Sequence, residues 1–241
     1  RRELATGFRA VNPMGHVWRG FAGTCAMGLG FAGLGYLPLP EVTAIGYAAP
    51  LLTVVFAAMF LGEDVRLFRL SCVVLGLVGV LIVLTPRLSV LDGGAGHAEA
   101  LGAMLVLGGA VFAALAQVFV RKLVMTENTS AIVFWFSLTA TLLSLTTLPF
   151  GWVIPTGTEA ATLVGAGLLG GVGQILLTPS YREADASLVA PFDYASMIFA
   201  LLIGYFVFAE VPTWTMLGGA ALVFGEVQHG GLLTHPAATA A

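Results

Sequence analysis

Residues 36–64 read YLPLPEVTAIGYAAPLLTVVFAAMFLGED, and an altered copy, YREADASLVAPFDYASMIFALLIGYFVFAEVP, occupies residues 181–212. Each copy begins with polar residues, continues as an apolar span interrupted by proline, and has a Glu directly after the span. At an offset of 147 residues the identical pairs in this stretch are Val42/Val189, Tyr47/Tyr194, Ala48/Ala195 and Glu63/Glu210. A duplicated apolar unit of this kind is typical of membrane transporters built from internal repeats.

The composition indicates an integral membrane protein. The 241 residues are 58% hydrophobic and 10% charged, and the mean hydropathy is +0.96. A soluble domain carries about 25% charged residues. The chain has only one lysine and no basic stripe, so the charge pattern excludes a nucleic-acid-binding surface. Cys25 and Cys72 both lie in apolar runs, where we expect free thiols that pack as small apolar side chains.

Eight apolar runs are long enough to cross a bilayer, which takes about 20 helical residues. They are residues 16–36, 42–61, 67–84, 100–120, 131–150, 160–178, 188–208 and 212–232. The connections between them are short, so consecutive spans should form antiparallel hairpins. Because helices satisfy their own backbone polar groups in lipid, we predict an all-α integral membrane fold with eight transmembrane helices in this chain.

The basic residues orient these helices. In the alternating topology Arg87 alone falls on one side of the membrane. The nine other basic residues fall on the opposite side: Arg1, Arg2, Arg9, Arg19, Arg66, Arg69, Arg121, Lys122 and Arg182. Lys and Arg are retained on the cytoplasmic side of a membrane protein. Both ends of the chain are therefore predicted to be cytoplasmic.

The repeat relates helices that run in opposite directions. It pairs the second and third spans with the seventh and eighth, five helices later, and five is an odd number. Such inverted repeats serve alternating access in many secondary transporters. The fourth and fifth spans have no partner in this chain, so we expect a ten-helix fold of two inverted five-helix repeats whose first two helices would precede Arg1. Residues 1–98 would then hold the last three helices of the first repeat, and residues 99–241 the second repeat.

Three segments resemble a known family. PEVTAIGYAAPLLTVVFAAMFLGED (residues 40–64), LGLVGVLIV (75–83) and ASLVAPFDYASMIFALLIGYFVFAEVPTWTMLGGAALV (186–223) are similar to the two EamA-type repeats of the drug/metabolite transporter superfamily. The resemblance implies a ten-helix carrier of small metabolites in the bacterial inner membrane. We expect amino-acid export, as in the bacterial aromatic amino-acid exporters of this family. The alternative is uptake of riboflavin, S-adenosylmethionine or another metabolite.

Two prolines are candidate hinges. Pro50 lies near the middle of its span, where it has no N–H and its ring opposes the carbonyl of Gly46. It should bend the helix and free that carbonyl, either as a hinge or substrate acceptor or as a fixed kink needed for packing. Pro191 lies one turn into its span and should disturb the helix less. The second copy has Met197 at the position of Pro50, so the two halves need not bend alike.

Four side chains are candidates for substrate binding: Tyr47, Gln174, Asp193 and Tyr194. Asp193 lies about six residues inside its span, where a carboxylate is costly and normally faces a cavity or a partner. It is either a substrate-ammonium or proton site, or an interfacial carboxylate bonded to a helix end or an arginine. Tyr47 and Tyr194 are repeat partners that could contact one substrate from both halves, or simply pack. Gln174 lies deep in its span and could bind substrate or bridge two helices.

Other polar residues favour structural roles. Glu63 and Glu210 each end a span, where carboxylates cap helix N-termini, and the inverted repeat places them on opposite sides of the membrane. Glu226 could carry protons or pair with Arg19. The glycine-rich stretches 28–35 and 165–173 should let helices approach closely.

The sequence favours a carrier over the alternatives. There is no clustered nucleophile, acid/base pair or metal spacing, so we predict no enzyme activity, no metal and no cofactor. A channel remains an alternative, although rings of like charge and a filter sequence are absent from the sequence. The predicted partners are a small-molecule substrate and the lipid bilayer.

Overall fold

The structure, a computed structural model, describes residues 10–37, 39–63, 71, 96–194, 199, 202, 205 and 206. Every regular element of this described part is helical. The elements are α2 (Pro13–Gly33), α3 (Leu39–Gly46), α4 (Ala48–Leu61), α6 (Gly96–Leu123), α7 (Thr129–Leu145), η2 (Leu148–Phe150), α8 (Gly157–Glu183), α9 (Ala186–Val189) and η3 (Ala190–Tyr194).

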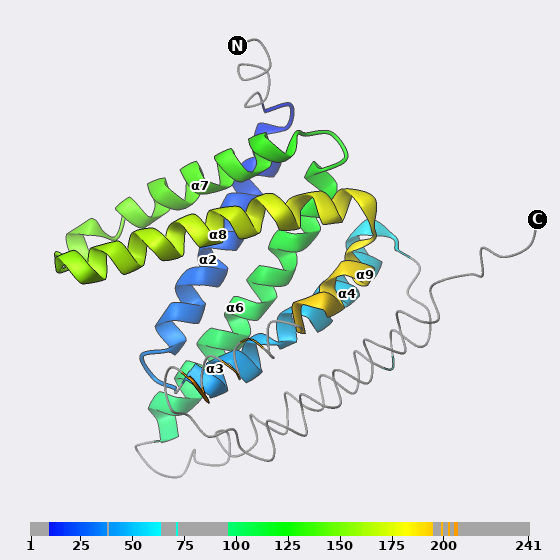
Figure 1. Cartoon of the computed structure of the whole chain (residues 1–241). Coiled ribbons are helices and arrows are strands. Elements are labelled where there is room, and N and C mark those ends of the chain that lie inside the picture. Colours follow the sequence, from blue (N-terminus) through cyan, green and yellow to red (C-terminus); the bar gives the residue numbers. More distant parts are fainter. Residues whose placement is uncertain are drawn as a thin grey trace, which may run out of the picture.

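The helices pack as a bundle around α6. This helix lies between α2 and α4, and α2 also contacts α7 (Figure 1). Helices α7 and α8 run side by side as an antiparallel pair, while the short α9 and η3 lie against α4 (Figure 1). Two clusters of buried apolar side chains hold the bundle together. One lies between α3, α4 and α6, and the other surrounds the fully buried Tyr181 where α4, α6, α8 and α9 meet.

Three segments of the described chain are long and apolar enough to cross a membrane. They are Glu41–Leu61, His97–Leu123 and Gly157–Glu183, which match three of the predicted spans. Helix α7 is apolar but shorter, with 17 residues, because the α-helix gives way to η2 around Pro149, which has no N–H for the helical ladder. The predicted spans 67–84 and 212–232 lie outside the described residues apart from Ser71, and the count of eight helices stays a prediction.

The second predicted span is broken near its proline. Helix α3 ends at Gly46, Tyr47 is in a turn, and α4 begins at Ala48, so that Pro50 falls in the first turn of α4. A proline is tolerated in a first helical turn because the N–H groups there have no partner within the helix. The break therefore lies where the missing hydrogen bond from Pro50 to Gly46 predicts it.

Helix starts follow their capping residues. Asn12 caps α2, since its Oδ1 accepts a 3.0 Å hydrogen bond from the Gly15 N–H, and Pro13 occupies the first helical position. Helix α8 starts with a capping box between Thr156 and Glu159. Because of these caps, α2 and α8 each start three residues earlier than hydrophobicity alone predicts.

Close packing explains only some of the glycines. A Cβ added at Gly33 would overlap Cγ2 of Val106 on α6, so α2 and α6 approach closely there. At Gly28 an added Cβ would meet nothing within 4 Å in the described structure, and the same holds for the glycines of α8 between residues 165 and 173. The prediction of glycine-mediated packing is confirmed at Gly33 and finds no support in the described structure along α8.

Candidate functional site

A buried arginine lies inside the helical bundle. Arg19 is on α2, six residues after Pro13, which is about 9 Å along the helix axis. The residue is only 4% exposed. Its Nη2 donates a 3.0 Å hydrogen bond to Oε1 of Gln174 on α8, and its guanidinium carbon lies 4.0 Å from the ring centroid of Phe136 on α7. Arg19 thus joins three helices through its charged end.

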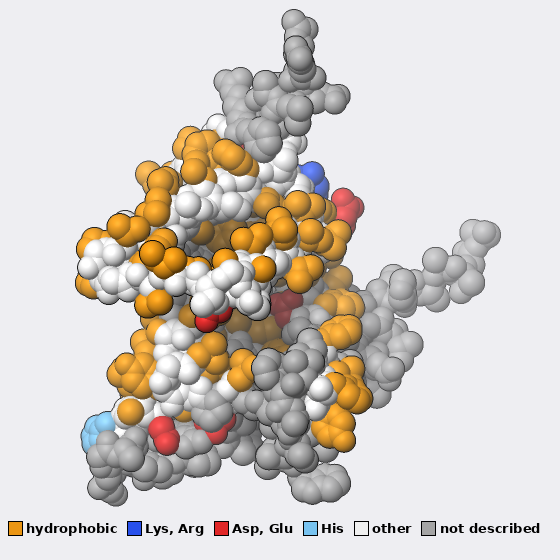
Figure 2. Space-filling view, turned by 60° about the vertical axis from the view of Figure 1, so that its left-hand side comes forward, with side chains coloured by type: hydrophobic (Ala, Val, Ile, Leu, Met, Phe, Trp, Pro, Cys, Tyr) orange, Lys and Arg blue, Asp and Glu red, His pale blue; other side chains and the backbone are white. Residues whose placement is uncertain are grey.

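The Arg19 guanidinium keeps donors that no acceptor in the described structure satisfies. Nε and Nη1 are both buried without a hydrogen-bond partner there. An uncompensated cation is costly away from water, and in membrane proteins such residues normally face a cavity, a pathway or a partner. The face of the molecule drawn in Figure 2 has a hollow, with acidic side chains at its lower edge.

Tyr181 connects the Arg19 region with the start of α9. Its side chain is fully buried, and its hydroxyl has no hydrogen-bond partner in the described part of the chain. It lies close enough to Arg19, Asp193 and Glu63 to interact electrostatically with each of them. A buried hydroxyl normally finds a partner, so this one is a second polar group available to a bound molecule.

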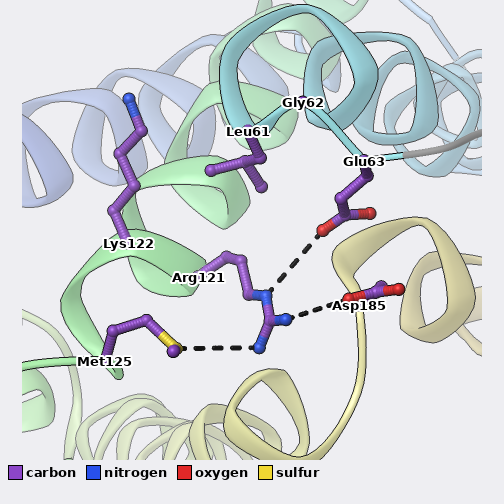
Figure 3. A pocket seen from close by; sticks show the side chains of 7 residues that line it. All are labelled: Leu61, Gly62, Glu63, Arg121, Lys122, Met125 and Asp185. Atoms are coloured by element: carbon purple, nitrogen blue, oxygen red, sulfur yellow. Dashed lines mark hydrogen bonds and ion pairs between the residues drawn. The ribbon is translucent and has the colours of Figure 1, made fainter.

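A second arginine ties together the chain segments at one end of the bundle (Figure 3). Arg121, at the end of α6, donates through Nη1 to the Tyr181 carbonyl at 2.6 Å and through Nη2 to Asp185 Oδ1 at 2.9 Å. Its Nε is 3.8 Å from Glu63 Oε1. Lys122 points away from both carboxylates (Figure 3). The surrounding pocket of about 460 Å³ is lined by Leu61, Gly62, Glu63, Arg121, Lys122, Met125 and Asp185.

Glu63 is a helix cap, as predicted, but for a distant helix. Its two carboxylate oxygens accept hydrogen bonds from the N–H groups of Ala186 and Ser187, at 2.9 and 3.0 Å. These amides open α9, more than 120 positions along the chain, whereas the prediction concerned free N–H groups near the next span. Glu63 therefore joins the end of α4 to the start of α9 and is already neutralised by amides and by Arg121. Glu210, its repeat partner, lies outside the described residues.

Glu127 performs a similar function at the start of α2. Its Oε1 accepts 2.7 Å hydrogen bonds from the N–H groups of Val11 and Asn12. His16 Nε2 lies 3.2 Å from the same oxygen without hydrogen-bond alignment. The Arg182 side chain donates to the carbonyl of Glu127 at 2.6 Å. Both glutamates thus hold together segments far apart in sequence, and neither is available to balance Arg19.

The model of the EamA-like transporter family matches residues 12–85 and 100–227, which together make up most of the chain. The chain belongs to the EamA-like transporter family. It is a membrane transporter of small molecules and not an enzyme.

Several relatives of this EamA-like chain carry transporter names. The S-adenosylmethionine uptake transporter of Rickettsia bellii is 28% identical over 218 residues, covering 89% of this chain and 71% of the relative. The riboflavin transporter of Vibrio cholerae is 29% identical over 210 residues, covering 86% of this chain and 68% of the relative. The pseudopaline exporter CntI of Pseudomonas aeruginosa (strain UCBPP-PA14) is 27% identical over 206 residues, covering 85% and 70%. These names differ in both substrate and direction.

A solved crystal structure shares the fold of this EamA-like chain. The TM-score is 0.73 at 24% sequence identity, and the alignment covers 96% of this chain and 81% of the other. At this identity the likeness concerns the fold alone.

The structure places the predicted site residues of the EamA-like chain in different surroundings. Gln174 is half-buried and bridges α8 to Arg19. Asp193 lies in η3, partly buried and within electrostatic reach of Tyr181. Tyr47 lies at the α3–α4 break and packs against the apolar cluster of α3, α4 and α6. The backbone of Tyr194 lies in η3, but its side chain is outside the described residues, as are Met197 and Glu226.

The candidate hinges both coincide with changes in helix geometry. Pro50 follows the one-residue break at Tyr47. Pro191 lies in η3, directly after the α-helix gives way to a 3₁₀-helix at Ala190.

Sequence reasoning missed the burial of Arg19 and Tyr181 in the EamA-like chain. Arg19 was interpreted as a cytoplasmic charge or as an ion-pair partner, because it lies only three residues inside the predicted span 16–36. The Asn12–Pro13 pair is a helix-start signal that moves the beginning of α2 upstream and Arg19 deeper into the helix. Tyr181 has no comparable signal, since its burial depends on four helices meeting.

Proposed function

We propose that the chain is a secondary carrier that exports amino acids or their derivatives across the bacterial inner membrane by alternating access. The observation that carries this proposal is the buried contact between Arg19 and Gln174. It joins α2 of the first predicted half (residues 1–98) to α8 of the second (residues 99–241). Polar groups held inside apolar helices, where two halves of a transporter meet, are typical of a substrate site.

The ion pairs at Arg121 fit a two-sided mechanism. Arg121 belongs to the second half and Glu63 to the first, so their 3.8 Å contact joins the two halves at the end predicted to be cytoplasmic. Alternating access requires contacts of this kind to open at one end while others close at the opposite end. In this proposal the halves rock about the breaks at Pro50 and Pro191, with Tyr47, Gln174, Asp193 and Tyr194 facing the substrate.

Uptake of a larger metabolite is the second candidate. The relatives named as transporters of S-adenosylmethionine and riboflavin favour it, while the pseudopaline exporter favours export. S-adenosylmethionine is itself an amino acid, whereas riboflavin has no carboxylate. An arginine-containing site therefore supports the amino-acid class more than the flavin.

Reconstitution tests the proposal directly. Purified protein in liposomes should accumulate at least one solute from a panel of labelled amino acids, S-adenosylmethionine and riboflavin, above protein-free liposomes. Preloading the vesicles and varying the side of addition gives the preferred direction. If no solute in this panel moves faster than in protein-free liposomes, the carrier proposal is wrong.

A further inference from the structure

Arg19 is a buried cation that is not balanced within the described structure. It is 4% exposed, it forms one hydrogen bond with the neutral amide of Gln174, and it forms no ion pair with a carboxylate of the described residues. Nε and Nη1, which carry most of the N–H bonds of the guanidinium, have no acceptor there. The charge and the free donors together call for an anionic partner.

The acidic residues at the same end of the bundle have partners of their own. Glu63 accepts from the two amides that open α9 and contacts Arg121. Asp185 pairs with Arg121. Glu127 accepts from the two amides that precede α2. Moving Glu63 or Glu127 to Arg19 would break at least two existing contacts of that residue, and moving Asp185 would break its pair with Arg121. A bound molecule can supply the anion without breaking any of these contacts.

We propose that Arg19 binds the carboxylate group of the transported metabolite, an inference that rests on the proposed carrier function. The planar guanidinium can give two parallel hydrogen bonds to a carboxylate, a geometry that a lysine cannot reproduce. Phe136 stacks on the guanidinium and Gln174 holds one of its nitrogens, so the orientation of the group is fixed before the substrate arrives.

The charge of the surroundings favours a zwitterion over a phosphate. Among the described residues, the Tyr181 side chain lies within electrostatic reach of Arg19, Asp193 and Glu63, and Glu63 is already paired with Arg121 and two amides. A doubly charged phosphate would be repelled by Asp193 and could be neutralised only in part by the Arg19 guanidinium. The carboxylate of an amino acid carries a single charge, and its ammonium group is attracted by Asp193. The site therefore fits an α-amino acid or a derivative that keeps both groups.

Paired ligands test this assignment on the unmodified protein. L-phenylalanine, L-methionine and L-histidine are each compared with their carboxamides, which keep the ammonium and side chain but lose the negative charge. Binding is measured in detergent as the ligand-dependent rise in unfolding temperature, which gives an apparent Kd. At least one acid should bind about 10- to 100-fold more tightly than its amide, the effect expected for a charge-assisted hydrogen bond. Equal binding of every acid and its amide would overturn the assignment.

Variants separate binding from a structural role. Arg19→Gln should reduce binding of the acid to the level of its amide and leave the amide unchanged. Arg19→Lys keeps the charge and loses the planar guanidinium, so it should bind the acid more weakly than the wild type and more tightly than Arg19→Gln. It replaces Arg19→Gln if the glutamine variant does not fold. Lys122→Gln is the matched control, because it removes an exposed cation and should keep the wild-type ratio. An equal loss of acid and amide binding in the Arg19 variants would assign Arg19 to folding instead.

Two further arms decide what any failure means. Inorganic phosphate that stabilises the wild type as well as the best acid would show a general oxyanion site and overturn the carboxylate assignment. Selective acid binding without transport into liposomes would contradict the carrier proposal and support the Arg19 site. Transport that does not distinguish acid from amide would support the carrier proposal and contradict the Arg19 site. Neither binding nor transport of any probe would overturn both.

Discussion

Replacing Arg121 by alanine should destabilise the protein by about 2–4 kcal/mol. The largest part comes from the 2.6 Å hydrogen bond to the Tyr181 carbonyl, because a charged donor contributes about 1.5–3 kcal/mol. The pair with Asp185 adds at most about 1 kcal/mol, since that side chain is 56% exposed and the interaction is screened. Glu63 loses a cation 3.8 Å away but keeps its two amide partners, so its share is small.

Thermal unfolding in detergent micelles, followed by circular dichroism, measures this loss. At about 2–4 °C per kcal/mol the Arg121→Ala variant should unfold roughly 4–16 °C below the wild type. Lys122→Ala is the control, because it removes the next cation along the helix, which is exposed and points away from the carboxylates (Figure 3). Its unfolding free energy should stay within about 0.5 kcal/mol of the wild type. Equal unfolding temperatures for the two variants would refute the assignment of Arg121 as the residue that joins these segments.

Three further substitutions test separate parts of the structure. Gly33→Ala should cost about 1–3 kcal/mol of stability through overpacking, whereas Gly28→Ala in the same helix should be neutral or stabilising by up to about 1 kcal/mol. Thermal unfolding compares the two variants, and equal effects would contradict the close approach of α2 to α6 at Gly33. Glu127→Gln should cost about 1–2 kcal/mol of stability because the two amides before α2 lose a charged acceptor. The control Glu183→Gln removes an exposed carboxylate and should change stability by less than about 0.5 kcal/mol. An equal loss of stability in both variants would argue against the role of Glu127 as a cap. Asp193→Asn should fold normally but lower the transport rate or alter its pH dependence, and wild-type kinetics from about pH 5 to 8 would exclude Asp193 from the site.

Three membrane-spanning helices of the described chain were predictable because apolar length is a property of local sequence. The predicted spans 42–61, 100–120 and 160–178 correspond to three helical segments that can cross a bilayer. Their ends were less predictable, since helix starts depend on caps such as Asn12 and Thr156 and not on hydrophobicity. The break at Tyr47 was predictable from Pro50, because proline removes a specific hydrogen bond.

The candidate site was predictable only in part. Gln174 was identified because an amide inside an apolar run is costly without a partner, and its partner is Arg19. The partner itself could not be inferred, since α2 and α8 are separated by 155 positions at this contact and their pairing depends on the fold. The same reason explains Glu63, whose position after a span indicated a cap but could not indicate that α9 is the helix it caps.

Counterflow in proteoliposomes tests the central claim, that the chain is a carrier whose binding site faces one side at a time. Vesicles are loaded with an excess of an unlabelled amino acid that the protein binds, diluted, and supplied with a trace of the same amino acid in labelled form. The proposed carrier predicts a transient accumulation of label above its equilibrium level, because the unlabelled amino acid inside competes with the label for the site and slows the exit of label. A flux that does not saturate and shows no such overshoot would contradict alternating access and support a channel.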